Sequence, residues 1–149
     1  GDVRVISLSS AAHAFGKKAR FFKQISDIST WSAYGDGKLA NLLFAKAAAK
    51  ELAGTGITDY SAHPGAVRTN FGSDTMGFAG KILQLARPFM RTSEQGAQTS
   101  VFLASAPLKS IGERNNGGYF ADSRPKSPSN RDVTDEHAEW LWEETLPYV

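Results

Sequence analysis

The sequence of 149 residues contains no cysteine and only three histidines. Without cysteine the chain forms no disulfide bond and offers no thiolate ligand to a metal, which fits a reducing compartment. His13, His63 and His137 do not have the spacing of metal ligands, and we interpret each as a structural or surface residue. We therefore expect no metal site in this chain.

Long apolar runs and a strong net charge are also absent. No apolar run approaches the roughly 20 residues that a membrane-spanning helix needs, and the start of the chain lacks the pattern of a signal peptide. We therefore expect no membrane segment, and the cytoplasm is the default location because no targeting segment is recognised. The formal net charge is +2 and the lysines are scattered, so we expect no nucleic-acid partner.

The composition, with 41% hydrophobic and 21% charged residues, is typical of one globular unit. Short apolar or β-branched segments predict three strands, at residues 3–8, 57–62 and 118–121. Apolar residues at helical spacing predict four helices, at about residues 31–53, 78–89, 92–105 and 132–145. The order strand, helix, strand with a right-handed crossover indicates an α/β fold with a parallel sheet.

Turn-forming residues predict the connections between these elements. We expect a long loop at residues 9–28, shorter loops at 66–76 and 110–116, and a proline-containing linker at 125–128. Loops of about 20 residues are uncommon unless they carry function. Thr92 and Gln95 have the spacing of a capping box that opens the third helix.

The stretch 33–41 holds the two side chains with the clearest chemical use. If residues 31–53 form one helix, Tyr34 and Lys38 lie one turn apart on the same face. A free tyrosine, with a pKa of about 10, is a poor acid or base at neutral pH, and a positive charge about 4 to 6 Å away favours its phenolate form. Tyr34 is therefore a candidate proton shuttle. Ser10, just past an apolar strand, offers a hydroxyl to an oxygen that gains or loses charge.

Taken alone, Tyr34 and Lys38 are more simply an ordinary pair on an amphipathic helix, and Ser9-Ser10 is a local turn. Four motifs in order change this interpretation: Ser9-Ser10-Ala11-Ala12-His13, the stretch Tyr34-Gly35-Asp36-Gly37-Lys38-Leu39-Ala40-Asn41, His63-Pro64-Gly65-Ala66-Val67-Arg68-Thr69, and Gly118-Tyr119-Phe120 with Leu141-Trp142-Glu143. In this order and spacing the chain resembles the short-chain dehydrogenases/reductases, most closely the retinol-dehydrogenase-like group. The resemblance covers nearly the whole chain.

The resemblance implies an NAD(P)-dependent oxidoreductase, in which hydride moves between the nicotinamide and a substrate carbon while Tyr34 exchanges a proton with the substrate oxygen. It implies three catalytic residues, Ser10, Tyr34 and Lys38, with Ser10 rather than Ser9 orienting the substrate oxygen. It also implies cofactor contacts from Tyr34, Lys38, Pro64, Gly65, the backbone of Val67 and the hydroxyl of Thr69. NADP is favoured over NAD by the resemblance alone, and the expected substrate is a small apolar carbonyl or alcohol.

The family's glycine-rich phosphate loop has no counterpart in this sequence. Gly35-x-Gly37 lies in a helix, Gly54-x-Gly56 follows a helix, and Gly77-x-x-Gly80 opens no strand-to-helix turn. We therefore expect the C-terminal portion of a doubly wound Rossmann-type sheet, a single partial domain over residues 1–149 whose first strand is an open edge. As an isolated fragment it should bind the dinucleotide poorly and be inactive.

Two other functions stay open. A noncatalytic truncated relative would dock on a full-length subunit through the first strand and the alanine-rich helix, or associate with its own copies. Alternatively, the Tyr34 and Lys38 chemistry would serve epimerisation or dehydration, although the surroundings of His13 and the tail of the chain argue against this use. A local departure is Gly37, where the family usually has serine or threonine, because a second glycine in one helical turn costs about 1 kcal/mol relative to alanine.

Overall fold

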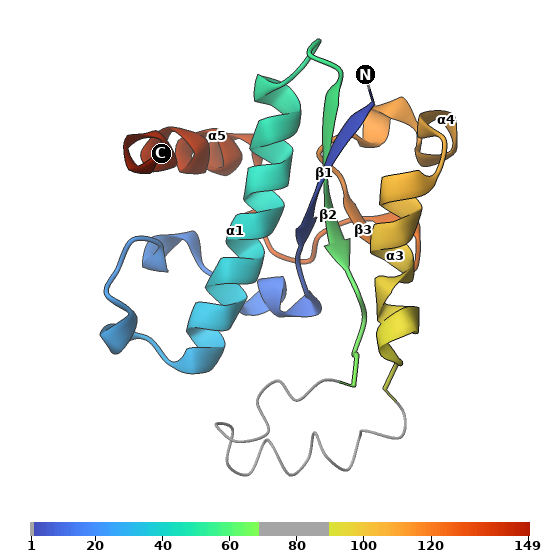
Figure 1. The fold of residues 1–149 in the computed structure, drawn as a ribbon. Helices are drawn as coiled ribbons and strands as arrows, with labels where there is room; N and C mark the ends of the chain where they lie inside the picture. The colour runs from blue at the N-terminus through green and yellow to red at the C-terminus, as the bar shows by residue number, and fades with distance from the viewer. Residues whose placement is uncertain (1, 69–89) are drawn as a thin grey trace.

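One four-stranded sheet forms the centre of the structure, a computed structural model that describes residues 2–68 and 90–149 (Figure 1). The sheet order is β1 (Val3–Leu8), β2 (Ile57–His63), β3 (Tyr119–Ala121) and β4 (Arg124–Lys126). The first three strands are parallel, and β4 is antiparallel to β3. The predicted α/β fold with a mainly parallel sheet is confirmed.

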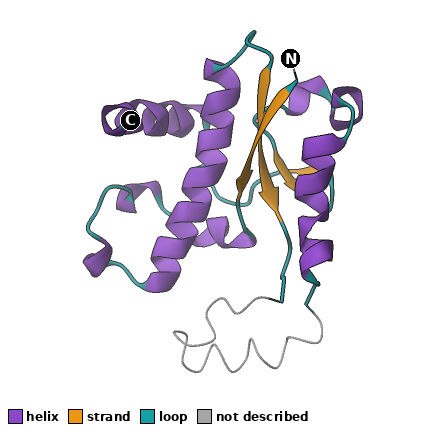
Figure 2. Ribbon diagram, viewed as in Figure 1, coloured by secondary structure: helices purple, strands orange, loops and turns teal. Residues whose placement is uncertain are grey.

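Helices lie on both sides of this sheet (Figures 1 and 2). Helix α1 (Thr30–Glu51) covers one face, and α3 (Ser93–Ser105), followed by the short α4 (Leu108–Ile111), covers the other. Helix α5 (Asp135–Thr145) packs against α1. The predicted strand, helix, strand unit is therefore present as β1, α1 and β2. The predicted helix at 78–89 lies outside the described residues.

Side-chain caps define the starts of the two longest helices. Ser29 Oγ accepts a hydrogen bond from the N–H of Ser32 at 3.2 Å, which opens α1. Thr92 Oγ1 accepts from the N–H of Gln95 at 3.3 Å, while the Gln95 side-chain oxygen accepts from the N–H of Thr92 at 2.9 Å. The predicted capping box is therefore confirmed.

The core consists of two apolar clusters. The first joins α1 to α5 and contains Leu39, Leu43, Ala47, Ala138 and Leu141. The second joins the sheet to α3 and α4 and contains Tyr60, Ala62, Leu103, Ile111 and Phe120. Because a fully buried leucine contributes roughly 1.5–3 kcal/mol, the first cluster holds α1 in place along its middle turns. In the described part of the chain no helix is both long enough and apolar enough to cross a membrane.

The predicted linker at 125–128 is wrong, because β4 pairs with β3 in a hairpin. The turn residues Asp122 and Ser123 have φ angles of 55° and 56°. Positive φ at both central residues is the geometry of a tight two-residue hairpin turn. Pro125 then occupies an edge strand, which is where proline is tolerated in a sheet.

Two predicted loops also contain regular turns. The segment 9–28 forms three 3₁₀ turns, η1 (Ala11–Phe15), η2 (Lys18–Arg20) and η3 (Ile25–Asp27). The segment 110–116 contains the end of α4 and the turn η5 (Glu113–Asn115). These turns are too short to leave a periodic apolar pattern, which explains why the sequence predicted loops.

Strand β1 is an edge of the sheet within the described residues, as predicted. It pairs with β2 alone, and its residues Val3, Val5 and Leu8 are 53%, 38% and 49% exposed. A strand buried on both faces and paired on both sides would hide these apolar side chains. β1 therefore offers both a free backbone edge and exposed apolar surface.

Asp59 on β2 is a carboxyl group inside the core. It is 1% exposed, and neither carboxylate oxygen has a hydrogen-bond partner among the described residues. Its backbone is well held, since its N–H donates to Asn116 Oδ1 and its carbonyl accepts from the N–H of Gly117, both at 2.8 Å. Burial raises the pKa of the Asp59 carboxyl from 3.8 to about 7.

We expect Asp59→Asn to stabilise the chain at alkaline pH. A raised pKa means that the folded state holds the proton more tightly than the unfolded state, so stability falls as the pH rises from about 4 to about 7. Asparagine stays neutral, so the free energy of unfolding of the variant should exceed that of the unaltered chain by about 3 to 5 kcal/mol at pH 8 and match it near pH 4. Urea denaturation measures both values.

The exposed Asp27 provides the matched control for this experiment. Asp27→Asn makes the same chemical change without removing a buried charge, and it should leave the pH profile of stability unaltered. Parallel profiles for Asp59→Asn and the unaltered chain would contradict the assignment of the buried charge.

Candidate active site

The carboxyl ends of β1 and β2 bring the predicted site residues to one edge of the sheet. Ser9 and Ser10 follow β1, and Pro64 and Gly65 follow β2. The arrowheads of the two strands point to this edge, beside the first turns of α1 (Figure 1). In open α/β sheets, ligands bind outside the carboxyl ends of the strands. This edge is therefore the candidate active site.

The carbonyl oxygen of Leu8, the last residue of β1, accepts hydrogen bonds from two side chains of α1. Lys38 Nζ and Asn41 Nδ2 each donate to it at 2.9 Å. Ser9 adds a contact in the opposite direction, because its buried hydroxyl donates to the backbone carbonyl of Lys38 at 2.9 Å. These three hydrogen bonds fix α1 against the end of β1 and place the Lys38 ammonium beside the Ser9-Ser10 segment.

Tyr34 and Lys38 are neighbours on α1. The Lys38 nitrogen lies 5.5 Å from the centroid of the Tyr34 ring, and the Trp31 ring meets the same ring edge-on at 6.1 Å. One helical turn between the two residues produces this approach. The phenol and the ammonium therefore share one face of the helix at the strand end.

Ser10 begins the turn η1 and differs from Ser9 in what its hydroxyl does. Its Oγ accepts a hydrogen bond from the N–H of Ala12 at 3.2 Å, a contact that leaves the hydroxyl proton to be donated elsewhere. The Ser9 hydroxyl, by contrast, donates its proton to the Lys38 carbonyl of α1. Among the described residues, the Ser10 oxygen is held by a hydrogen bond that it accepts, and its hydroxyl can still donate to a ligand.

Sequence reasoning missed how the backbone of Ser10 is held. The buried ring of His13 contacts the Ser10 carbonyl through Nδ1 at 2.6 Å, and its Nε2 accepts from the N–H of Ser129 at 3.2 Å. Asn130 donates to the carbonyls of His13 and Gly16 at 2.6 and 2.8 Å. Ser129 and Asn130 thus hold the turn after Ser10 through hydrogen bonds, although they lie more than a hundred residues later in the chain. A contact over this separation leaves no local sequence pattern.

The Pro64-Gly65 turn at the end of β2 packs against Arg91, another residue that the sequence analysis missed. Gly65 has a φ of 82°, and a Cβ there would lie 2.8 Å from Arg91 Nε. Arg91 also donates to the Pro64 carbonyl at 3.4 Å and pairs with Asp122 at 2.5 Å. Glycine at position 65 is therefore favoured by its backbone conformation, and the absence of a side chain there lets Arg91 pack closely against the turn.

Val67 lies in a short parallel bridge with Arg91. The N–H of Arg68 donates to the Arg91 carbonyl at 2.9 Å, and the N–H of Arg91 donates to the Ala66 carbonyl at 2.8 Å. The N–H and carbonyl of Val67 itself take part in neither bond, because in a parallel pair they point away from the partner strand. Thr69, the last predicted site residue, lies outside the described residues.

His63 supports the same turn as a neutral side chain. Its Nδ1 accepts a hydrogen bond from the N–H of Gly65 at 3.3 Å. Burial, followed by the nearby charge of Arg91, lowers the pKa of the His63 imidazole below 6.5. No group of three or more histidine or acidic side chains within residues 2–68 and 90–149 has the geometry of a metal site.

Comparison with known sequences finds similarity to retinol dehydrogenases and other short-chain dehydrogenases. Retinol dehydrogenase 12 from Mus musculus is 40% identical over 145 aligned positions, which cover 93% of this chain and 43% of the relative. Short-chain dehydrogenase TIC 32 A, chloroplastic, from Brassica napus is 36% identical over 155 positions, covering 98% of this chain and 47% of the relative. The chain is a homologue of the short-chain dehydrogenases/reductases. It spans about half the length of the curated relatives it matches.

Two solved structures contain a similar fold within longer chains. A crystal structure of a protein from Mycobacterium paratuberculosis aligns with a TM-score of 0.65 at 26% identity, over 94% of this chain and 47% of that one. The NADPH-bound carbonyl reductase from chicken fatty liver aligns with a TM-score of 0.53 at 17% identity, over 83% of this chain and 42% of that one, a likeness of fold alone. No protein-family profile matches the sequence.

The two glycines around Tyr34 have different surroundings. A Cβ on the exposed Gly37 meets nothing within 4 Å. A Cβ on the buried Gly35 lies 3.0 Å from the Ala12 carbonyl oxygen and 3.2 Å from the backbone nitrogen of Gly16. Gly35 therefore lets α1 approach η1 closely, whereas Gly37 carries only the entropic cost of glycine in a helix.

We expect Gly37→Ala to raise the free energy of unfolding by about 1 kcal/mol, because alanine is the better helix former and has room. Gly35→Ala should lower it, because backbone atoms of η1 must move. Urea denaturation of both variants tests the pair, and equal stabilisation by the two alanines would show that α1 does not contact η1 as described.

Proposed function

We propose that the chain carries the proton-transfer part of an NAD(P)-dependent oxidoreductase site of the short-chain dehydrogenase/reductase type, acting between a carbonyl and an alcohol. The observation that supports it best is the pair of hydrogen bonds at the Leu8 carbonyl. They bring the Lys38 ammonium to the strand end that also presents Ser10, with Tyr34 one turn away. These groups belong to segments at the edge where α/β proteins bind ligands, which supports the proposal.

Each of the three side chains has a separate chemical task in this proposal. During carbonyl reduction the Tyr34 hydroxyl gives its proton to the substrate oxygen, and during alcohol oxidation it takes the proton back. The positive charge of Lys38 favours the phenolate that remains after the transfer. The Ser10 hydroxyl, anchored through the N–H of Ala12, donates a hydrogen bond to the substrate oxygen as negative charge develops there.

The residues after β2 fit the nicotinamide end of a dinucleotide. The backbone groups of Val67 stay outside its bridge with Arg91, so they suit a carboxamide. Pro64 and Gly65 would form the adjoining wall, Thr69 would add a hydroxyl, and Lys38 and Tyr34 would meet the ribose. When bound, the dinucleotide supplies or accepts the hydride. NADP is preferred over NAD from the resemblance alone, with a small apolar carbonyl or alcohol as substrate.

The proposal predicts that Tyr34→Phe lowers kcat for NAD(P)H-dependent reduction of aldehydes and ketones by about 10²- to 10⁴-fold, the range of a general acid. The cofactor Kd should change far less than kcat, because Lys38 and the residues after β2 would still hold the cofactor. Steady-state kinetics on a form that also carries the N-terminal half of the fold, together with cofactor titration, measure both quantities. Tyr148→Phe removes the same hydroxyl from an exposed tyrosine and should have no effect. Unchanged turnover in Tyr34→Phe would disprove the assignment.

The alternative function, a noncatalytic subunit that docks on a full-length relative, is favoured by one observation. β1 has a free edge and exposed apolar side chains at Val3 and Val5. An added strand would satisfy the free backbone groups and cover these side chains. The same surface would also serve association between copies of the chain.

This alternative predicts a stoichiometric complex between the 149-residue chain and a full-length relative, measured by size-exclusion chromatography with light scattering. Val5→Lys, which places a charge on the exposed face of β1, should abolish the complex. The exposed Val101 on α3 gives the matched control, Val101→Lys. A monomeric, folded chain that forms no complex would exclude docking.

A further inference from the structure

The ring of Tyr119, the first residue of β3, contacts both histidines of the candidate active site. It meets the His13 ring edge-on, with the two centroids 5.1 Å apart, and lies nearly parallel to the His63 ring, with centroids 6.5 Å apart. Both separations are within the range of about 4.5–7 Å at which aromatic rings attract one another. Tyr119 and His13 are 7% and 2% exposed, so their contact is made inside the fold.

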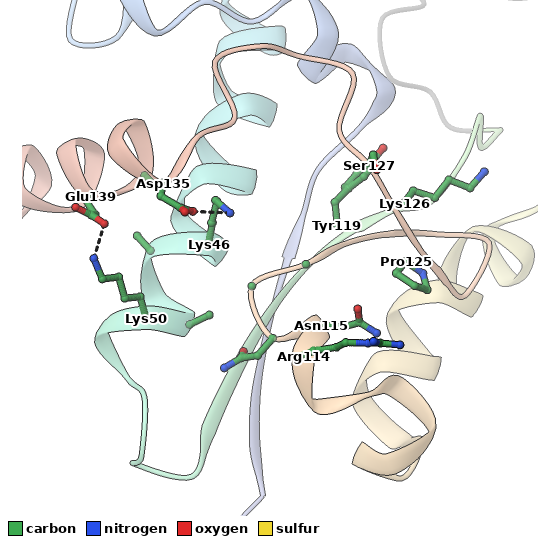
Figure 3. Close-up of a pocket in the computed structure, with 16 residues that line it drawn as sticks. Lys46, Lys50, Arg114, Asn115, Tyr119, Pro125, Lys126, Ser127, Asp135 and Glu139 are labelled. Atoms are coloured by element: carbon green, nitrogen blue, oxygen red, sulfur yellow. Dashed lines mark hydrogen bonds and ion pairs between the residues drawn. The ribbon is translucent and has the colours of Figure 1, made fainter.

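The register of the sheet explains why these rings meet. Tyr119 pairs with Ser61, and His63 follows two residues later on the same face of β2. His13 comes from η1, which packs against α1. The Tyr119 side chain also borders an open hollow between α1 and the β3–β4 hairpin, apart from the ion bridges that join α1 to α5 (Figure 3). The ring therefore lies where three separate segments of the chain come together.

The two histidines hold different turns of the site. His13 Nε2 accepts a hydrogen bond from the N–H of Ser129 at 3.2 Å, so its ring proton is on Nδ1 and is donated to the Ser10 carbonyl at 2.6 Å. His63 Nδ1 accepts from the N–H of Gly65 at 3.3 Å, so its ring proton is on Nε2. Each of these bonds needs its imidazole ring in one orientation.

We propose that Tyr119 is a positioning residue of the proposed oxidoreductase site, because its ring keeps both imidazole rings in place. Through His13 it fixes the backbone of Ser10, whose hydroxyl faces the substrate oxygen in the proposed function. Through His63 it fixes the Gly65 turn, which adjoins the nicotinamide in that proposal. Both contacts are made by the aromatic ring and not by the hydroxyl, so phenylalanine serves equally well at this position. The catalytic consequence rests on the proposed function, whereas the ring contacts do not.

Amide hydrogen exchange of the 149-residue chain tests this positioning without any turnover. Tyr119→Leu should accelerate exchange of the Gly65 and Ser129 amides by up to about tenfold relative to the other amides of the sheet, the size expected for one lost hydrogen bond. Tyr119→Phe should leave both rates unaltered. The matched control is Phe120→Leu, which removes a buried ring from the opposite face of β3, where it contacts Tyr60. This control should not single out the same two amides.

Kinetics on a form that also carries the N-terminal half of the fold measure the consequence for catalysis. Tyr119→Leu should lower kcat/KM for the carbonyl substrate by about 10- to 100-fold and raise the cofactor KM, because displaced turns misalign the reacting groups. Tyr119→Phe should keep both values, and Phe120→Leu should change them far less. Retained turnover in Tyr34→Phe would refute the proposed function alone and would leave the exchange result standing.

Nuclear Overhauser contacts in the unaltered chain provide a test that does not depend on the folding of any variant. They should join the ring protons of Tyr119 to those of His13 and His63. Their absence, or unaltered exchange in Tyr119→Leu, would overturn the proposal. Equal selective acceleration of the two amides in Phe120→Leu would also overturn it, as would unchanged kinetics of Tyr119→Leu in a form that Tyr34→Phe inactivates.

Discussion

The carbonyl oxygen of Leu8 is the point on which the candidate site depends. It accepts hydrogen bonds from Lys38 and Asn41, two residues three positions apart and therefore on one side of α1. Two anchors on one side fix both the distance of the helix from β1 and its rotation about its own axis. Rotation decides where Tyr34 points, so the orientation of this side chain follows from the end of a strand that lies about thirty residues earlier in the chain.

Apolar contacts on another side of α1 fix the same rotational orientation of the helix. Leu39 and Leu43 are completely buried in the cluster with α5, and the added cost of exposing them opposes any turn of α1. Apolar burial and polar anchoring therefore select one orientation. In the proposed function, a tyrosine positioned in this way would need no rearrangement of the helix before it transferred a proton, which is the sense in which such sites are preorganised.

Local sequence patterns were sufficient for those parts of the molecule that local physics determines. The spacing of Tyr34 and Lys38, the capping box at Thr92 and the positions of the first three strands could all be predicted, because each depends on residues a few positions apart. The roles of His13, Ser129 and Arg91 could not, since their contacts join segments separated by tens to more than a hundred residues. The strand β4 was missed for a different reason: its proline indicated a linker, while two positive φ angles in the turn produced a hairpin.

Helix α1 is held at three places along its length, and these contacts together fix its position. The active-site end is held at Leu8, the middle by the leucine cluster, and the far end by the bridges from Lys46 and Lys50 to α5. A change confined to the ion bridges at the far end alters the last of these supports only. Moving Tyr34 would require the whole helix to shift against the other two, at a cost of several buried leucine and hydrogen-bond contacts. The orientation of Tyr34 therefore depends on the Leu8 carbonyl and the leucine cluster and not on the exposed ion bridges.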